Sequence, residues 1–113
     1  MKYSFQIQEY DDNTESLVVC IEDTLFDDFL NSFFSIDGVP FCKELFTIIC
    51  GVVNGISEYD YFSGNAFEVE IKKDYSMIST DYPIRQLSEC EIKTEELFNI
   101  ISAYLDEMEK IHK

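Results

Sequence analysis

Residues 59–79 read YDYFSGNAFEVEIKKDYSMIS and contain the clearest strand signal in the chain. From Phe67 to Lys72, apolar and charged side chains alternate, which is the period-two pattern of a strand with one buried and one exposed face. Lys73-Asp74 predicts a tight reversal into a second strand from Tyr75 to Ser79. We interpret the residues before Phe67 as an acidic, aromatic turn. The expected hairpin has an apolar face for helices and a charged face for solvent or a partner.

The N-terminal residues predict a second hairpin. Apolar and polar side chains alternate from Tyr3 to Gln8, and a polar turn follows at residues 10–15. Residues 16–22 contain the apolar run LVVCI, which indicates a strand buried on both faces or central in the sheet.

Two helices are expected between these hairpins. The first covers about Leu25 to Ser35 with a wide apolar stripe, and Asp37-Gly38 ends it. Pro40 suits the first position of the second helix, which runs from about Phe41 to Val53. This second helix is apolar nearly all round and should be well buried. Asn54-Gly55 stops it.

The C-terminal part predicts an irregular segment at residues 80–88, a short strand from Cys90 to Lys93, and an amphipathic helix from Thr94 to Met108. This helix should cover the aromatic sheet face. The order β-β-α-α-β-β-(β)-α predicts a single α+β domain over residues 1–113. Its antiparallel or mixed sheet has four to five strands, with about three helices packed on it.

Charge is the strongest compositional feature of the chain. There are 23 acidic and 8 basic residues, which gives a net charge of −15. Nucleic acid and anionic membranes are poor partners for such a chain, because binding polyphosphates requires Lys and Arg. A cationic protein is the natural complement, although acidity can also serve solubility alone. The start has no apolar signal segment and no run reaches membrane-spanning length, so we expect a cytoplasmic protein.

The residue types for catalysis are scarce. His112 is the single histidine and lies at the C-terminus, where it cannot form a nucleophile–base pair. Glu68 and Glu70 share a strand face, but in so acidic a chain a solvated face explains them better than an acid/base pair. The four cysteines form no CxxC pair and are interpreted as buried thiols rather than zinc ligands. We therefore predict no enzyme and no catalytic, cofactor or metal site.

Acidic, tyrosine-containing segments recur at three predicted turns. Tyrosine provides rigid contact area, and carboxylates pair with Arg and Lys of a partner. The alternative is ordinary polar turns whose tyrosines pack inward. Together with the charged face of the central strand, the predicted partner-binding residues are Asp11, Asp12, Glu58, Tyr59, Asp60, Tyr61, Glu68, Glu70, Asp81 and Tyr82.

Three segments together resemble a known class of protein: FDDFLNSFF at residues 26–34, YFSGNA at residues 61–66 running into Glu70-Ile71, and IKTEEL at residues 92–97. They resemble small bacterial immunity proteins of contact-dependent growth inhibition and related polymorphic-toxin systems, with their YacL-like relatives. The resemblance implies a small cytosolic protein that binds the C-terminal toxin domain of a cognate effector, often a nuclease, and blocks its active site or substrate entry. It carries over no catalytic or contact residues. The alternative function is a stand-alone acidic regulatory or structural interaction domain, alone or as a homodimer.

Overall fold

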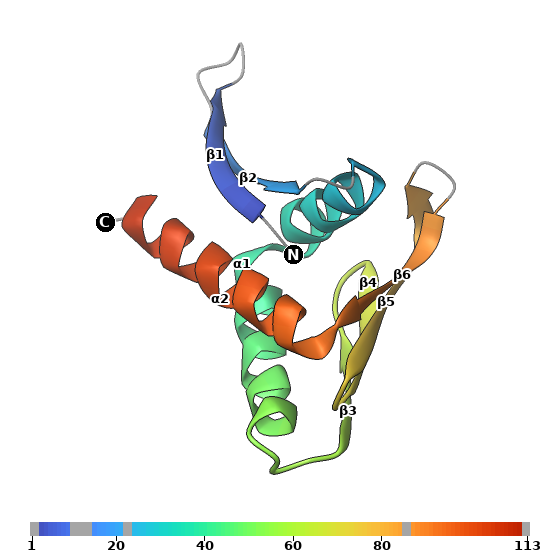
Figure 1. Cartoon of the computed structure of the whole chain (residues 1–113). Coiled ribbons are helices and arrows are strands. Elements are labelled where there is room, and N and C mark those ends of the chain that lie inside the picture. The colour runs from blue at the N-terminus through green and yellow to red at the C-terminus, as the bar shows by residue number, and fades with distance from the viewer. Residues whose placement is uncertain (1–2, 10–14, 22–23, 85–86, 112–113) are drawn as a thin grey trace.

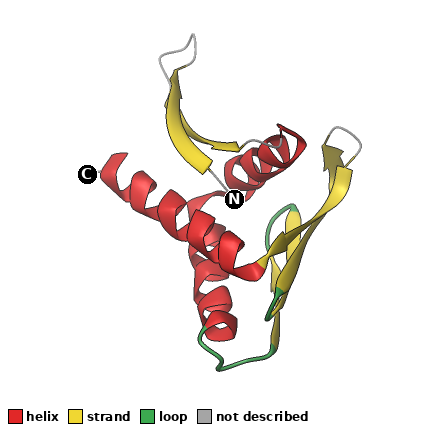
Figure 2. Cartoon of the chain, in the orientation of Figure 1, coloured by secondary structure: helices red, strands yellow, loops and turns green. Residues whose placement is uncertain are grey.

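In this computed structural model, residues 3–9, 15–21, 24–84 and 87–111 are described. They form an α+β fold, as predicted, with six strands and two helices. The elements are β1 (Tyr3–Glu9), β2 (Glu15–Ile21), α1 (Thr24–Val53), β3 (Tyr59–Ser63), β4 (Phe67–Lys72), β5 (Tyr75–Ile84), β6 (Leu87–Lys93) and α2 (Thr94–Ile111). One antiparallel sheet contains β1 and β2, and a second has the order β3-β4-β5-β6. Both helices lie on the same side of the larger sheet (Figures 1 and 2).

The central hairpin is confirmed. Phe67, Val69 and Ile71 on β4 are buried, and the residues between them face outward. The chain reverses at Lys73-Asp74 and returns as β5, in the register that pairs Ile71 with Ser76. The segment predicted to be irregular at residues 80–88 is largely strand, because β5 continues to Ile84 and pairs there with the start of β6. The pairing of β5 with β6 is nevertheless irregular between Ser79 and Ile84. The predicted strand Cys90 to Lys93 is the second half of β6.

The turn predicted before the central strand is also wrong. Residues Tyr59–Ser63 form β3, an edge strand antiparallel to β4. The aromatic residues that we interpreted as part of a turn favour strands, and Phe62 is 1% exposed and anchors β3 in the core. The Gly64 N–H donates to the Phe67 carbonyl at 2.8 Å, which closes the β3–β4 turn.

The N-terminal hairpin is confirmed, but it does not join the larger sheet. β1 and β2 pair with each other over their whole length. Of the two alternatives for β2, the central position is wrong, because β2 pairs only with β1 among the described strands. Val19 and Ile21 are buried, whereas Leu17, Val18 and Cys20 are only partly buried. The side-chain amide of Asn31 on α1 lies at the other edge of β2. Asn31 Oδ1 accepts the Val19 N–H, and Nδ2 donates to the Val19 carbonyl, both at 2.8 Å. Asn31 thus replaces a neighbouring strand at this point.

Two helices are present in the described residues where about three were predicted. The expected break at Asp37-Gly38 is a kink inside α1, where Gly38 has φ 79° and ψ 179°. A positive φ is readily adopted by glycine, and Pro40 fits the start of the second arm. The backbone is therefore non-helical at Gly38, and α1 consists of two helical arms that meet at the predicted break without a longer loop between them.

The core lies between the helices and the inner face of the larger sheet. Phe67 on β4 meets Phe29 and Phe33 of α1 edge to face, with ring centroids 5.5 and 5.3 Å apart. Phe34 stacks on Tyr104 of α2 at 4.1 Å. The amphipathic stripe predicted for α2 is buried as expected. Neither helix has an apolar segment long enough to cross a bilayer within the described residues.

Candidate protein-binding face

The strand register defines the outer surface of the larger sheet. Residues paired across antiparallel strands point to the same side, so side chains of four strands form three rows. The lysine row is Tyr59, Lys72, Tyr75 and Lys93; the middle row is Tyr61, Glu70, Met77 and Glu91; the glutamate row is Ser63, Glu68, Ser79 and Glu89. We call these twelve residues the open face.

No described element covers the open face. α1 and α2 both lie against the opposite side of the sheet, where Phe62, Val69 and Ile78 are buried (Figure 1). By contrast, Tyr59 is 50% exposed and Tyr61 is 45% exposed. Large aromatic side chains that remain half exposed on a sheet provide contact area without the entropic cost of ordering a loop.

Charge is not uniform over the open face. Four glutamates occupy the middle and glutamate rows, and two lysines occupy the row next to the β4–β5 turn. Lys72 Nζ lies 3.5 Å from Glu70 Oε1, with the two side chains 66% and 46% exposed. Such an exposed ion pair stabilises the fold by only about 0–1 kcal/mol. Both groups therefore remain available to a partner.

Tyr61 and Glu68 are coupled across β3 and β4. A hydrogen bond from the Tyr61 hydroxyl to the Glu68 carboxylate raises the pKa of Tyr61, and partial desolvation and nearby negative charges raise it further. The phenol is thus a neutral donor at neutral pH. This contact links the middle row to the glutamate row.

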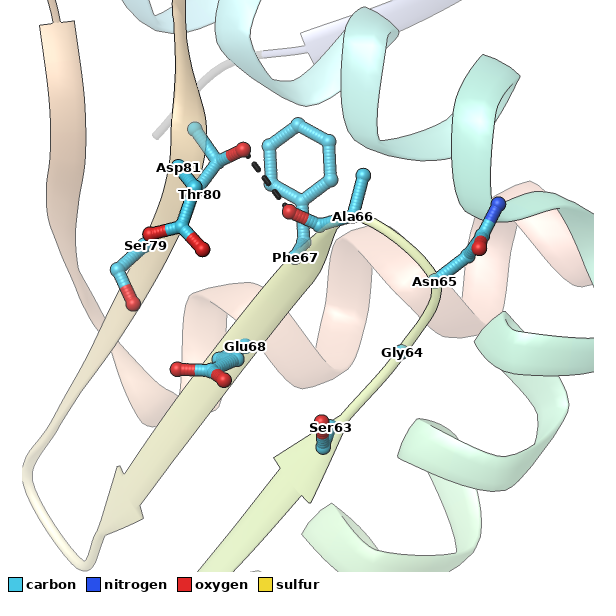
Figure 3. A pocket seen from close by; sticks show the side chains of 9 residues that line it. All are labelled: Ser63, Gly64, Asn65, Ala66, Phe67, Glu68, Ser79, Thr80 and Asp81. Carbon is cyan, nitrogen blue, oxygen red and sulfur yellow. Dashed lines mark hydrogen bonds between the residues drawn. The ribbon is translucent and has the colours of Figure 1, made fainter.

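A shallow polar pocket of about 240 Å³ adjoins the glutamate row. Figure 3 shows Glu68 of β4 facing Ser79 of β5, with the 63–66 segment along the opposite wall. The Thr80 hydroxyl donates to the Ala66 carbonyl at 2.9 Å and closes the inner end. Asp81 adds a second carboxylate. Oxygen atoms on several sides suit a cationic side chain from a partner.

A buried carboxyl supports the loop beneath this pocket. Asp37, at the kink of α1, is 5% exposed, and its Oδ1 accepts the Ala66 N–H at 2.8 Å. Oδ2 is buried with no hydrogen-bond partner. Burial raises the pKa of Asp37, and the backbone amides of Ala66, Phe67 and Asn65 offset only part of this rise. From the sequence, Asp37 was assigned only to a helix end, and no spacing pattern marks it.

The four cysteines differ in burial. Cys42 is buried, and burial with the nearby Asp37 charge raises its pKa to about 12. Its thiol is therefore protonated at neutral pH and is a poor nucleophile. Cys20, Cys50 and Cys90 are only partly buried, so the expectation of four buried thiols is wrong for them. The described residues contain no group of three or more His, Cys, Asp or Glu residues arranged to hold a metal ion.

The predicted partner-binding residues divide into four sets. Those on the open face or at its pocket are Tyr59, Tyr61, Glu68, Glu70 and Asp81. Glu58 is exposed directly before β3. Asp60 is paired with Ile71 on the inner side of the sheet, and its Oδ1 accepts the Tyr61 N–H. Asp11 and Asp12 lie outside the described residues, as does the side chain of Tyr82.

Eight of the twelve residues of the open face were not assigned to a binding site from the sequence. Lys72 was expected on the charged side, but neither it nor Tyr75, Met77, Glu89, Glu91 and Lys93 was assigned to a binding site. Once the turn is placed at Lys73-Asp74, the alternation of side chains along the return strand predicts that Tyr75 and Met77 lie on the same side of the sheet as Glu70. Glu89 lay next to the segment predicted to be irregular.

Comparisons with known protein families, curated proteins and solved structures find no match for this chain.

Proposed function

We propose that this protein is an immunity protein that binds and neutralises the C-terminal toxin domain of a cognate effector in the bacterial cytoplasm. It acts by binding, without catalysis of its own. In this proposal the toxin domain is a nuclease, and the open face covers its basic active-site or substrate groove. The observation that carries the proposal is a four-stranded sheet surface, bearing four glutamates and three tyrosines, that no described element covers.

Electrostatics supports this pairing. A nuclease presents Lys and Arg to the phosphates of its substrate. A carboxylate-rich surface can occupy the same groove, and opposite charges accelerate the encounter of the two proteins. The net charge of −15 extends this attraction beyond the open face. Because carboxylates and phosphates are both negatively charged, an acidic protein can compete with nucleic acid for the same groove.

The side chains of the open face also suit a protein partner. Tyrosine and methionine are enriched at interfaces relative to the rest of the surface. Tyr61 and Met77 lie in the middle row with glutamates between and beside them. The middle row thus alternates apolar contact area with carboxylates, and in protein interfaces a few such side chains dominate the binding energy. The resemblance of three sequence segments to immunity proteins points to the same function.

A stand-alone, self-associating domain is the second candidate. Val53 and Ile56, near the end of α1, are 40% and 83% exposed. Exposed apolar side chains of this size favour association with another surface. Sedimentation separates the two candidates, because a homodimer that persists at high salt, in a protein that forms no complex with a toxin, would favour the second.

The direct test is to mix the protein with the product of the gene immediately upstream. We expect a complex on gel filtration at low salt, weakening as salt rises, and protection of cells on co-expression. E70K/E91K should reduce affinity about 10- to 100-fold, because it reverses charge within the contact. E44K/E109K is the matched control, since it makes the same net charge change on the two helices. Absence of both a complex and protection rejects the proposed function.

A further inference from the structure

The two lysines on the open face are unexpected in so acidic a protein. The whole chain has 8 basic residues, and Lys72 and Lys93 lie in the same row of one sheet face. A partner that was uniformly basic would be repelled by this row. The lysine row therefore needs its own explanation.

Neutralising the sheet itself does not explain the lysine row. Directly opposite residues on adjacent strands interact most strongly, so lysines that served this purpose would face glutamates. The cross-strand neighbours of Lys72 and Lys93 are tyrosines: Tyr59 pairs with Lys72, and Tyr75 pairs with Lys93. The contact of Lys72 with Glu70 runs along one strand and is well exposed. Positive charge is thus gathered at one end of the face.

The distance between the two ends is large enough for them to act separately. Lys72 and Glu68 are four residues apart on β4, which corresponds to about 13 Å along a strand. The Debye length at physiological salt is about 8 Å, so each end meets mainly the charges placed against it.

We propose that the open face recognises a partner whose own contact surface is bipolar. Basic side chains of the partner lie against Glu68 and Glu89, and carboxylates about 13 Å away lie against Lys72 and Lys93. This inference rests on the proposed function and adds to it the orientation of the toxin domain. Only one direction of docking matches both ends, so the lysine row selects the cognate partner against other basic proteins.

A second copy of the chain is a less suitable occupant. A two-fold axis through the middle row would place each lysine row on a glutamate row, as an isologous dimer requires. Each face nevertheless carries four glutamates and two lysines, and each chain carries a charge of −15, so two copies repel each other.

The test compares K72E/K93E with K43E/K110E in binding to the upstream gene product. Lys43 and Lys110 lie on α1 and α2, so the control makes the same net charge change away from the open face. A bipolar partner predicts that K72E/K93E binds at least about tenfold more weakly than the control, since two charge contacts become repulsive. A uniformly basic partner predicts that K72E/K93E binds as well as the control or more tightly.

The remaining outcomes also decide the matter. A wild-type complex that K72E/K93E leaves unchanged or tightens rejects this inference and leaves the proposed function in place. A wild-type protein that forms no complex and gives no protection rejects both. If the protein alone sediments as a dimer and K72E/K93E makes it monomeric, the occupant of the face is a second copy and the inference is wrong. Circular dichroism of each variant checks that the fold is retained.

Discussion

A Cβ atom at Gly64 would overlap with Oδ2 of Asp37, so the β3–β4 turn and the kink of α1 are fitted to each other. The two residues are 27 positions apart in the sequence. Their close approach lets the Asp37 carboxyl accept the Ala66 N–H and hold the loop beside the glutamate row. The shape of the pocket therefore depends on the absence of a side chain at Gly64.

Gly64→Ala should lower the free energy of unfolding by about 1–3 kcal/mol, because the added methyl group displaces a buried carboxyl. Gly51→Ala is the matched control. Nothing lies within 4 Å of a Cβ at Gly51, and its position in α1 favours alanine by about 0.5–1 kcal/mol. Denaturant titration should show that Gly64→Ala lowers the free energy of unfolding relative to the wild type and that Gly51→Ala raises it. In an Asp37→Ala background, Gly64→Ala should lower the free energy of unfolding by less than it does in the wild type. An equal decrease in both backgrounds would contradict the close approach of Gly64 to the Asp37 carboxyl.

Asp37→Asn should become progressively more stable than the wild type as pH rises. Burial raises the pKa of Asp37 above its ordinary value of 3.8, so the folded state holds this proton more tightly than the unfolded state. The wild type therefore loses stability from about pH 3.8 up through the raised pKa, whereas the amide of the variant does not ionise. The unfolding free energies of Asp37→Asn and the wild type should be most similar at low pH, and the difference between them should grow as pH rises. A difference that shrinks with rising pH would refute this assignment.

Glu68→Ala should lower the pKa of Tyr61 towards its ordinary value, because the hydrogen bond to Glu68 is the largest cause of the increase. Glu70→Ala should lower it less, since Glu70 is the smallest of the contributors. Chemical shifts of ring-labelled tyrosine, followed through alkaline pH, measure both effects. Equal effects of the two variants would place the Tyr61 hydroxyl elsewhere on the sheet.

Asn31→Ala should lower the free energy of unfolding by about 1–3 kcal/mol, because it leaves the N–H and carbonyl of Val19 without their partners. Asn99→Ala, at an exposed position of α2, should change it by no more than about 0.5 kcal/mol. Hydrogen exchange of the Val19 amide should accelerate only in Asn31→Ala. An unchanged exchange rate would mean that the amide is protected in another way.

The sequence predicted the features that depend on local pattern. Alternation identified β4 and its buried face, and the helical period identified α2 and the stripe of α1. Tyr59–Ser63 was misassigned because its aromatic residues favour a strand whereas Asp60 and Ser63 favour a turn, and pairing with β4 decides between them. The extent of β5 and β6 likewise depends on their pairing with each other.

Features that depend on contacts distant in sequence could not be predicted. Asn31 is an ordinary polar residue of a helix until β2 lies beside it. The role of Gly64 is set by Asp37 rather than by its own backbone angles, so local turn chemistry gives no hint of it. Four of the twelve residues of the open face were predicted, because Glu68 and Glu70 could be placed by alternation whereas Glu89 and Glu91 required the register of a strand pair.

The N-terminal hairpin is joined to the rest of the protein by side chains rather than by a shared ladder of main-chain hydrogen bonds within the described strands. Such a unit can open by subglobal unfolding at a lower free energy than the four-stranded sheet. Loss of the hairpin would uncover the Tyr104 side of the core while the open face kept its pairing. If the open face binds a partner as proposed, that partner would not cover the hairpin, and proteolysis could still begin there.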